Sequence, residues 1–405
     1  MRLLCLSNGH GEDAIAVRIL QALEQEGFSQ IEALPIVGEG HAYAKLDIPV
    51  IGTVKTMPSG GFIYMDGQQL ARDIQGGLVQ LTWAQIKAVQ AWAREGDRFI
   101  LAVGDIVPLL FAWLSGAPYA FVATAKSEYY LRDEKGWLPR KSWWDDRLER
   151  WTDCIFQPWE RWLMRRPQCK AVFPRDRITA NILKRFDVPA FDLGNPMMDG
   201  LAWQNNTTDP SVLTIALIPG SRPPEVYDNW EIILRSLDGL LEHFRKPLQL
   251  ITAVAPGLDS EKLHQILISY RWKRCEINHY KIGFGEKQAT LELAPNRFAE
   301  CLQRSQVAIA MAGTATEQFI GLGKPAIIIP GNGPQFTSAF AEAQTRLLGA
   351  SVTLVEQPNQ VAGALQSLLS DPDRLQTIAE NGHRRMGEPG AAHRIATCLL
   401  EKMGS

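Results

Sequence analysis

The sequence predicts an α/β protein of two Rossmann-like domains, each with a parallel sheet covered by helices. Short apolar segments alternate with helical segments along the whole chain. A strand, a glycine turn and a helix open each half, near residues 2–26 and again near 212–244. The 405 residues are enough for two domains. A polar, turn-rich stretch at 201–211 places the domains at 1–200 and 201–387.

Runs of apolar and β-branched residues mark the expected strands. In the first half these are residues 2–7, 31–36, 99–103, 119–123, 153–156, 170–173 and 190–193. In the second half they are residues 212–218, 248–254, 276–280, 307–310, 326–329 and 351–355. Helices are expected at about 14–26, 223–244, 295–304 and 314–321, and a last one at about 391–403.

Composition and charge exclude several classes of protein. The chain is 46% hydrophobic, 21% charged and has a net charge of −2, so no basic field suggests a nucleic-acid partner. Its six cysteines are scattered without a CxxC pair, and we expect buried thiols rather than a metal or disulfide framework. Asp371 and Asp373 have metal-like spacing but stand where a helix would be capped. Because Arg2 leads directly into a strand, no leader peptide is expected, and the protein is expected in the cytoplasm.

Residues 310–335 have the composition of a nucleotide site. Gly313 turns the chain after an apolar strand, and a short helix follows. The first amides of this helix, those of Thr314, Ala315 and Thr316, suit a phosphate. Glu317 lies one turn into that helix, where a carboxylate can accept hydrogen bonds from a ribose diol; it is equally well placed as a stabilising acid of a first helical turn. Gln335 follows a second glycine turn and can contact sugar hydroxyls.

A second glycine turn, Gly220-Ser221-Arg222, follows the first strand of the second half. Two prolines then favour a helix start, where a cation gains nothing from the helix dipole. A surface arginine without a role is the alternative, but this unfavourable placement favours a function for Arg222, whose guanidinium can pair with a diphosphate in bidentate fashion.

These two segments resemble the nucleotide-sugar site of GT-B glycosyltransferases. GTATEQFIGLGKPAIIIPGNGPQ, at 313–335, is similar to lipid-A-disaccharide synthases and to the peptidoglycan transferase MurG, and GSRPPEV, at 220–226, is similar to the GSR-x-x-EV loop of the former. The resemblance implies two domains facing across a cleft, with a last helix (388–405) returning to the first domain. It implies that Glu317 holds the ribose of a UDP-sugar and that Gln335 holds the sugar. An inverting transfer without cofactor or metal follows, with the UDP-sugar as donor.

The general base of such a transfer has to come from the first domain. His10 lies in the first glycine turn and has a suitable intrinsic pKa. Asp105 follows the strand at 99–103, and Asp13 is a third candidate. Either acid can instead be structural, Asp13 as a helix cap and Asp105 as a turn former. The turn also fits a loose dinucleotide fingerprint, Gly9-x-Gly11-x-x-Ala14 with Glu32 as the distant acid, so an NAD enzyme stays as an alternative.

The expected acceptor is a lipid. Residues 126–185 hold six of the twelve tryptophans and fifteen Lys or Arg against nine Asp or Glu, a combination that suits a membrane–water interface. Packing of these tryptophans beneath helices is the alternative. The glycine-rich stretch 54–83 is expected to form an irregular acceptor-side lid. We therefore expect a cytoplasmic protein, peripheral on the inner membrane face.

The first half departs from lipid-A-disaccharide synthases. Their first loop reads AGExSGD, against SNGHGED at 7–13, and their DxPDFN strand end appears here as Gly-Asp-Ile-Val-Pro at 104–108. A different acceptor is therefore expected. Two other functions fit the same scaffold: a UDP-GlcNAc 2-epimerase-like enzyme, and a binding protein without catalytic activity.

Overall fold

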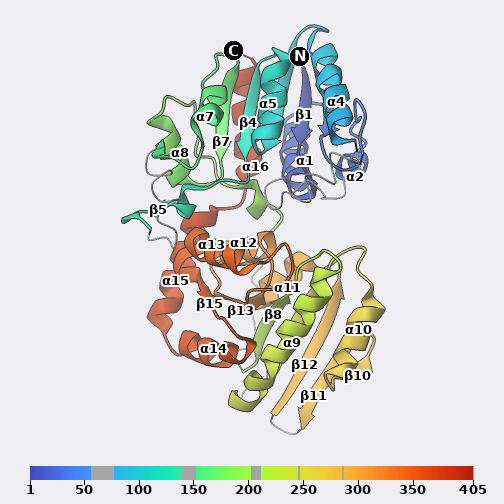
Figure 1. The fold of residues 1–405 in the computed structure, drawn as a ribbon, viewed down its shortest axis with the longest axis vertical. Helices are drawn as coiled ribbons and strands as arrows, with labels where there is room; N and C mark the ends of the chain where they lie inside the picture. The colour runs from blue at the N-terminus through green and yellow to red at the C-terminus, as the bar shows by residue number, and fades with distance from the viewer. Residues whose placement is uncertain (56–76, 139–151, 202–210, 245–246, 285–286, 405) are drawn as a thin grey trace. The chain divides into compact units, whose positions relative to one another are not determined.

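The computed structural model describes the chain except for residues 56–76, 139–151, 202–210, 245–246, 285–286 and 405 (Figure 1). The chain divides into two compact units. Unit 1 contains residues 1–199 and 388–405, and unit 2 contains residues 200–387. Most of the stretch expected to separate the two domains, and most of the expected acceptor-side lid, lie outside the described residues. Each unit is a doubly wound α/β structure and is described by itself.

Unit 1 is built on a five-stranded parallel sheet in the order β2-β1-β3-β4-β7. Its strands are β1 (Arg2–Ser7), β2 (Ile31–Pro35), β3 (Arg98–Gly104), β4 (Tyr119–Ala123) and β7 (Cys169–Pro174). Its helices are α1 (His10–Gln25), α2 (His41–Ala44), α4 (Leu78–Ala93), α5 (Ile106–Ser115), α7 (Pro158–Met164), α8 (Arg177–Lys184) and α16 (Ala391–Met403). A short hairpin of β5 (Arg132–Asp133) and β6 (Gly136–Trp137) stands apart from this sheet. The strands are buried almost throughout, as expected for a sheet covered on both faces.

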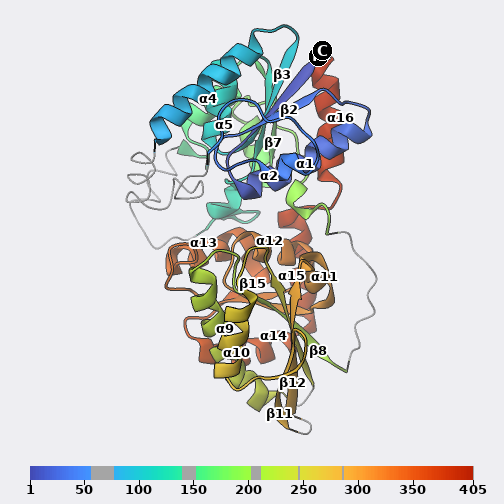
Figure 2. The ribbon, with the colours of Figure 1, turned by 90° about the vertical axis from the view of Figure 1, so that its right-hand side faces the viewer.

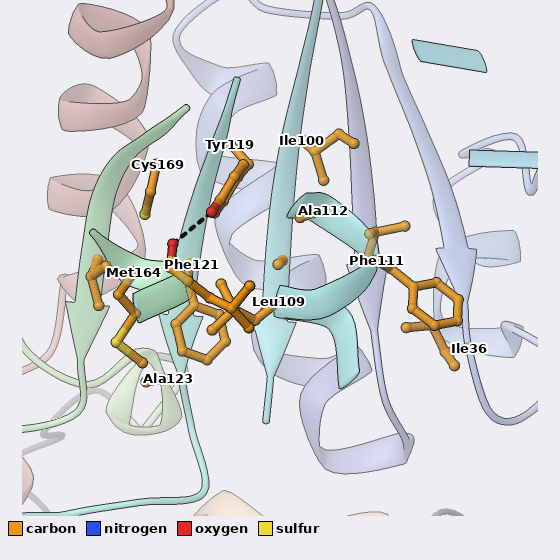
Figure 3. Packing of buried hydrophobic residues seen from close by; sticks show 14 of the residues in the cluster. Ile36, Ile100, Leu109, Phe111, Ala112, Tyr119, Phe121, Ala123, Met164 and Cys169 are labelled. Atoms are coloured by element: carbon orange, nitrogen blue, oxygen red, sulfur yellow. Dashed lines mark hydrogen bonds between the residues drawn. The ribbon is translucent and has the colours of Figure 1, made fainter. Parts of the chain in front are cut away.

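Two layers of helices cover the two faces of this sheet. On one face α4, α5 and α7 pack through residues such as Leu81, Leu109 and Leu163. Figure 3 shows this core, in which the hydroxyl of Tyr119 donates to the carbonyl of Leu163 at 2.7 Å. On the other face α1 packs beside the last helix, α16 (Figure 2). The apolar positions of α16, spaced at helical intervals, are the ones that this contact buries.

Unit 2 is built on an eight-stranded sheet in the order β10-β11-β12-β9-β8-β13-β14-β15. The strands are β8 (Leu213–Ile218), β9 (Leu248–Val254), β10 (Lys273–Glu276), β11 (His279–Phe284), β12 (Lys287–Pro295), β13 (Val307–Ala310), β14 (Ala326–Ile328) and β15 (Val352–Leu354). The helices are α9 (Glu225–His243), α10 (Ser260–Ser269), α11 (Phe298–Arg304), α12 (Thr314–Gly321), α13 (Ser338–Leu348), α14 (Val361–Leu369) and α15 (Pro372–Met386). The run from β12 to β15 is parallel, and β10 and β11 extend it as an antiparallel hairpin.

Several expected elements differ from the structure. Residues 153–156 form turns and bends and do not join the sheet. Their apolar side chains, Cys154 and Phe156, are buried all the same. Residues 190–193 contribute only the isolated bridge of Ala190 to Val172. The strand expected at 276–280 spans the turn between β10 and β11, where Asn278 has a positive φ of 62°. The polar strand β12 has no counterpart among the expected strands, and α4 begins within the stretch expected to be irregular.

Candidate functional site

The strand orders give each unit one topological switch point. In unit 2 the parallel strands follow the order 3-2-1-4-5-6, in which β8 is the first strand and β13 the fourth. The chain leaves β8 toward one side of the sheet and returns at β13 on the other. Open α/β sheets bind ligands at such a switch point, outside the carboxyl ends of the two strands. The two predicted glycine turns, after β8 and after β13, both lie at this point.

The helix α12 begins at this switch point. Its N-cap is Gly313, and no side chain caps its first amides. A Cβ on Gly313 would lie 3.1 Å from the ring of Phe340, so a larger residue would crowd the turn. The hydroxyl of Thr316 donates to the Ala312 carbonyl at 2.5 Å and fixes the turn from within. The amides at 314–316 therefore form a partly positive helix end that suits a phosphate, as the sequence predicted.

Glu317 is 6% exposed and does not simply face solvent. Its Oε1 accepts a hydrogen bond from Nε2 of Gln344 on α13, at 3.1 Å. Gln344 is itself buried, and the sequence offered no signal for it because it stands among the ordinary polar residues of α13. A carboxylate that is oriented by a neighbouring helix, beside helix amides, suits the two hydroxyls of a ribose.

The turn after β8 brings Gly220, Ser221 and Arg222 to the same end of the sheet. Gly220 has a φ of 103°, a conformation that favours glycine, and a Cβ there would lie 3.7 Å from the Met311 carbonyl at the end of β13. Ser221 is exposed and Arg222 is partly buried. The helix α9 begins three residues later than Arg222, at Glu225.

The third loop of unit 2 is the glycine turn after β14, at residues 330–336. Gln335 is exposed, and its backbone N–H donates to both oxygens of the Glu225 carboxylate, at 3.2 and 3.1 Å. The N–H of Phe336 donates to the same carboxylate at 2.9 Å. The backbone of this loop is thus tied to the first turn of α9, a contact between distant segments that sequence reasoning missed.

In unit 1 the strand order 2-1-3-4-5 places the switch point between β1 and β3. Asn8 follows β1 and Asp105 follows β3, and the amide of Asn8 donates to Oδ2 of Asp105 at 3.1 Å. Oδ1 of Asp105 accepts from the N–H of Val107 at 2.8 Å, so Asp105 is also the N-cap of α5. Burial raises the pKa of Asp105 above its usual value, and the charge of Glu160 adds to this, while the two hydrogen bonds and the charge of Lys126 oppose it.

Lys126 and Glu160 are the residues near Asp105 that sequence reasoning missed. Nζ of Lys126 lies 2.7 and 2.6 Å from the two oxygens of Glu160, whose side chain is buried. Lys126 follows the carboxyl end of β4, and this position was the only signal for it. The pair adds one cation and one carboxylate to the surroundings of Asp105, and their opposite effects on its pKa are smaller than the effect of burial.

The other two candidate bases lie in α1. His10 is the first residue of this helix, and its side chain is outside the described part of the structure. Asp13 is buried and accepts from the hydroxyl of Ser7 at 2.5 Å, while Ser7 accepts from Tyr43 at 2.6 Å. The N-cap of α1 is Gly9, so Asp13 is not the cap of this helix.

The structure also gives the contacts of two other acids considered from the sequence, the distant acid of the dinucleotide fingerprint and the acid with metal-like spacing. Glu32 lies in β2, with Oε1 2.9 Å from Arg2 and Oε2 accepting from the Trp92 indole at 2.5 Å, so this acid is engaged within unit 1. Asp371 caps α15 by accepting from the N–H of Arg374 at 2.9 Å. Among the residues that the structure describes, no three His, Cys, Asp or Glu side chains gather as a metal site.

Five exposed large apolar side chains lie on the helices of one layer, α4, α5 and α7, and we call this set the aromatic face. It consists of Val79, Trp83, Leu110, Trp159 and Trp162. Trp83 is 61% and Trp159 is 60% exposed. Lys87 lies over the ring of Trp83 at 5.1 Å and Arg166 over the ring of Trp162 at 4.0 Å. The only acid in these three helices, Glu160, is buried.

Only part of the predicted tryptophan cluster is described. Trp137 stacks under Arg132 at 4.1 Å, whereas Trp143, Trp144 and Trp151 lie outside the described residues. Trp83 belongs to the aromatic face but to a helix outside the segment in which the cluster was predicted. None of the helices in the described ranges is long and apolar enough to span a bilayer.

Comparison with known proteins begins with sequence. No family model matches the chain. Over 210 residues it is 27% identical to a lipid-A-disaccharide synthase of Syntrophus aciditrophicus (strain SB), a match covering 47% of this chain and 49% of that protein. The chain thus spans about half the length of the curated relative that it matches.

Solved structures are similar over the whole chain. CalG4, the calicheamicin glycosyltransferase, has a TM-score of 0.60 at 13% identity, with 100% of this chain and 98% of that chain covered. MurG of Acinetobacter baumannii has a TM-score of 0.54 at 14% identity, with 99% of each chain covered. The chain has the GT-B fold.

A UDP-GlcNAc 2-epimerase of Neisseria meningitidis, bound to UDP-GlcNAc, has a TM-score of 0.55 at 15% identity, with 99% of this chain and 100% of that chain covered. Because transferases and an epimerase are similar to it, the reaction has to be argued from the site.

Proposed function

We propose that the protein is an inverting, metal-independent glycosyltransferase that moves a sugar, of GlcNAc type, from a UDP-sugar to a lipid at a membrane surface. The observation that carries the proposal is the meeting of the loops after β8 and after β13 at the switch point of unit 2. They bring the amides of α12, the Gly220–Arg222 turn and Glu317 to one end of one sheet. Similarity to proteins whose names include UDP and UDP-GlcNAc supports the same ligand class.

Each part of a UDP-sugar has a counterpart in these loops. The diphosphate pairs with the Arg222 guanidinium and accepts hydrogen bonds from the amides of Gly220, Ser221 and residues 314–316. The ribose hydroxyls donate to Glu317, and the sugar lies against the loop that carries Gln335. When the bond between the anomeric carbon and the diphosphate breaks, the negative charge on UDP is met by the same cation and amides.

The acceptor hydroxyl attacks the anomeric carbon and loses its proton to a base of unit 1. Asp105 is the best-described candidate, since it lies at the β1/β3 switch point with a raised pKa that suits proton transfer. The hydrogen bonds from Asn8 and Val107 orient its carboxylate. His10 remains the second candidate by position, and Asp13 is the least accessible of the three because Ser7 and Tyr43 enclose it.

A lipid acceptor is supported by the aromatic face. Tryptophans with half-buried rings beside cations suit the boundary between lipid tails and headgroup phosphates. The absence of an exposed acid in α4, α5 and α7 removes the repulsion that an anionic membrane surface would otherwise meet. These features support a peripheral protein on the inner membrane face.

The test is transfer itself. Purified protein is incubated with radiolabelled UDP-GlcNAc or UDP-glucose and total membrane lipid, and the organic phase is counted. Label in the organic phase with the wild type, and none with Glu317→Ala, is the expected result. No label with any donor overturns the transferase proposal.

A 2-epimerase-like activity is the second candidate, because a UDP-GlcNAc 2-epimerase is similar over nearly the whole chain. Such an enzyme acts on a soluble nucleotide-sugar, and the aromatic face would then serve no purpose. Proton NMR of UDP-GlcNAc incubated with the protein distinguishes the two reactions, since an epimerase produces the C2 epimer without any lipid. Nucleotide binding without either product would indicate a binding protein on the same scaffold.

A further inference from the structure

Two side chains of α9 hold the three ligand loops of unit 2 in place. Glu225 and Asn229 lie four residues apart on this helix and therefore on one face of it. They are 5% and 3% exposed, so both are buried at the carboxyl edge of the sheet. Neither was singled out from the sequence, although Glu225 is the acid of the GSRPPEV segment.

The hydrogen bonds of the two residues go to different loops. Nδ2 of Asn229 donates to the carbonyl of Pro219 at 3.0 Å and to that of Met311 at 3.4 Å, which joins the ends of β8 and β13. The carboxylate of Glu225 accepts instead from the backbone N–H groups of Gln335 and Phe336, in the loop after β14. The hydrogen bonds of Asn229 thus go to the diphosphate turns and those of Glu225 to the sugar loop. Oδ1 of Asn229 also lies beside the start of the sugar loop, since a Cβ on Gly331 would stand 2.8 Å from it.

The contact between Glu225 and the sugar loop is close. A Cβ added to Gly333 would lie 2.4 Å from Cγ and Cδ of Glu225 and 2.7 Å from its Oε1. The backbone at Gly333 therefore rests directly on the acid, and only glycine permits this approach. Buried carboxylates with two or three backbone N–H donors make strong, directional hydrogen bonds, which fix a loop more firmly than neutral pairs.

We infer that Glu225 is a positioning residue that sets the loop 331–336 for the sugar of the donor, while contributing little to the nucleotide part. The inference rests on the proposed function, because it assigns the loops to the parts of a UDP-sugar. It predicts that changes at Glu225 separate the affinity for UDP-sugar from the affinity for UDP. Substitution of a residue needed only for folding would lower the affinity for both ligands together.

Titration calorimetry with UDP, UDP-GlcNAc and UDP-glucose tests the inference. For Glu225→Ala and Gly333→Ala we expect UDP affinity within twofold of the wild type and at least a tenfold loss for the UDP-sugar that the wild type binds. Glu225→Gln, which keeps one acceptor oxygen, is expected to lose less. Asn229→Ala is expected to weaken the binding of UDP, and that of UDP-sugar by at least as much, because Asn229 also lies against Gly331 of the sugar loop. Asp228→Asn is the matched control, since Asp228 is an exposed acid in the same helical turn, and it should behave as the wild type.

Two results overturn the inference: equal losses for UDP and UDP-sugar in Glu225→Ala, or no loss for either. Hydrogen–deuterium exchange of the unliganded protein separates this failure from failure of the proposed function. In Glu225→Ala the peptide covering 331–336 should exchange faster, with α12 unchanged. Unchanged exchange in that peptide refutes the loop contact whether or not the wild type binds nucleotides. A wild type that binds neither UDP nor UDP-sugar, with faster exchange in the variant, refutes the proposed function and leaves Glu225 as a loop anchor only.

Discussion

At the scale of single residues, the two candidate sites differ in how their carboxylates are held. Glu317 accepts a hydrogen bond from the side-chain amide of Gln344, whereas Asp105 is oriented by Asn8 and by the backbone of α5. Glu317 thereby suits a lasting contact with hydroxyls, and Asp105, with its raised pKa, suits the uptake of a proton. Neither neighbour, Gln344 nor Asn8, carries a charge, so each orients its partner without pairing with it.

Replacing Glu317 should weaken UDP binding. Hydrogen bonds to a charged group contribute about 1.5–3 kcal/mol, so Glu317→Ala is expected to raise the Kd for UDP roughly tenfold to a hundredfold. Calorimetric titration measures this change. Gln344→Ala, which removes only the orienting amide, should cost less than Glu317→Ala and should add little to it in the double variant. An unchanged Kd in Glu317→Ala contradicts the ribose contact.

The pH dependence of transfer should report Asp105. A base acts only when ionised, and burial raises the pKa of Asp105, so kcat/KM should fall with falling pH at a value above about 3.9, the ordinary aspartate pKa. Glu160 contributes to the raised pKa, hence Glu160→Gln should move this acid limb to lower pH. Asp105→Asn should lose most of the rate and show no such limb. Full activity of Asp105→Asn would assign the proton to another group, with His10 next to be tested.

At the scale of elements, the glycine turns and the strands beside them could be predicted, whereas contacts between distant segments could not. Val307–Ala310 and Thr314–Gly321 have the predicted bounds, because a buried apolar run and a following glycine are local signals. Residues 153–156 carry the same apolar signal but pack outside the sheet, and burial alone does not specify a strand. The roles of Glu225, Asn229 and Lys126 depend on neighbours more than 30 residues away, which one sequence does not reveal.

The packing of α15 on α12 gives a prediction at this scale. A Cβ on Gly382 in α15 would lie 2.1 Å from the Ile320 carbonyl oxygen of α12, so Gly382→Ala forces the two helices apart. Overpacking of this kind costs about 1–3 kcal/mol of unfolding free energy. Denaturant unfolding measures it, and UDP affinity should fall too because α12 carries the phosphate-binding amides.

Gly363 in α14 provides the control for this variant. It is exposed, and a Cβ there meets nothing within 4 Å. Gly363→Ala should therefore stabilise unit 2 by about 0.5–1 kcal/mol, the usual gain of alanine over glycine inside a helix. If both substitutions changed stability by the same amount and sign, the close contact of α12 with α15 would not be the cause.

At the scale of the whole molecule, exposed apolar side chains are distributed unevenly. Unit 1 carries the five side chains of the aromatic face with their cations, whereas the exposed large apolar side chains in the described part of unit 2 are Ile268 and Ile277. The net charge of −2 gives no general attraction to anionic lipid. Attraction to a membrane would therefore have to be local, through Lys87, Arg166 and the exposed rings.

Sedimentation with vesicles containing anionic lipid tests this surface. The wild type should bind, and the double variant Trp83→Ala/Trp159→Ala should bind at least tenfold more weakly, since each removed ring takes away about 1–3 kcal/mol of burial in the interface. Both rings are exposed, so the fold should tolerate the change. Ile277→Ser, at an exposed apolar side chain of unit 2, is the matched control and should leave vesicle binding unchanged.

Added salt should weaken the part of vesicle binding that comes from the cations and leave the part that comes from the rings. Equal binding by the wild type and the double variant would contradict a membrane role for the aromatic face, and the soluble epimerase-like function would then become the stronger candidate.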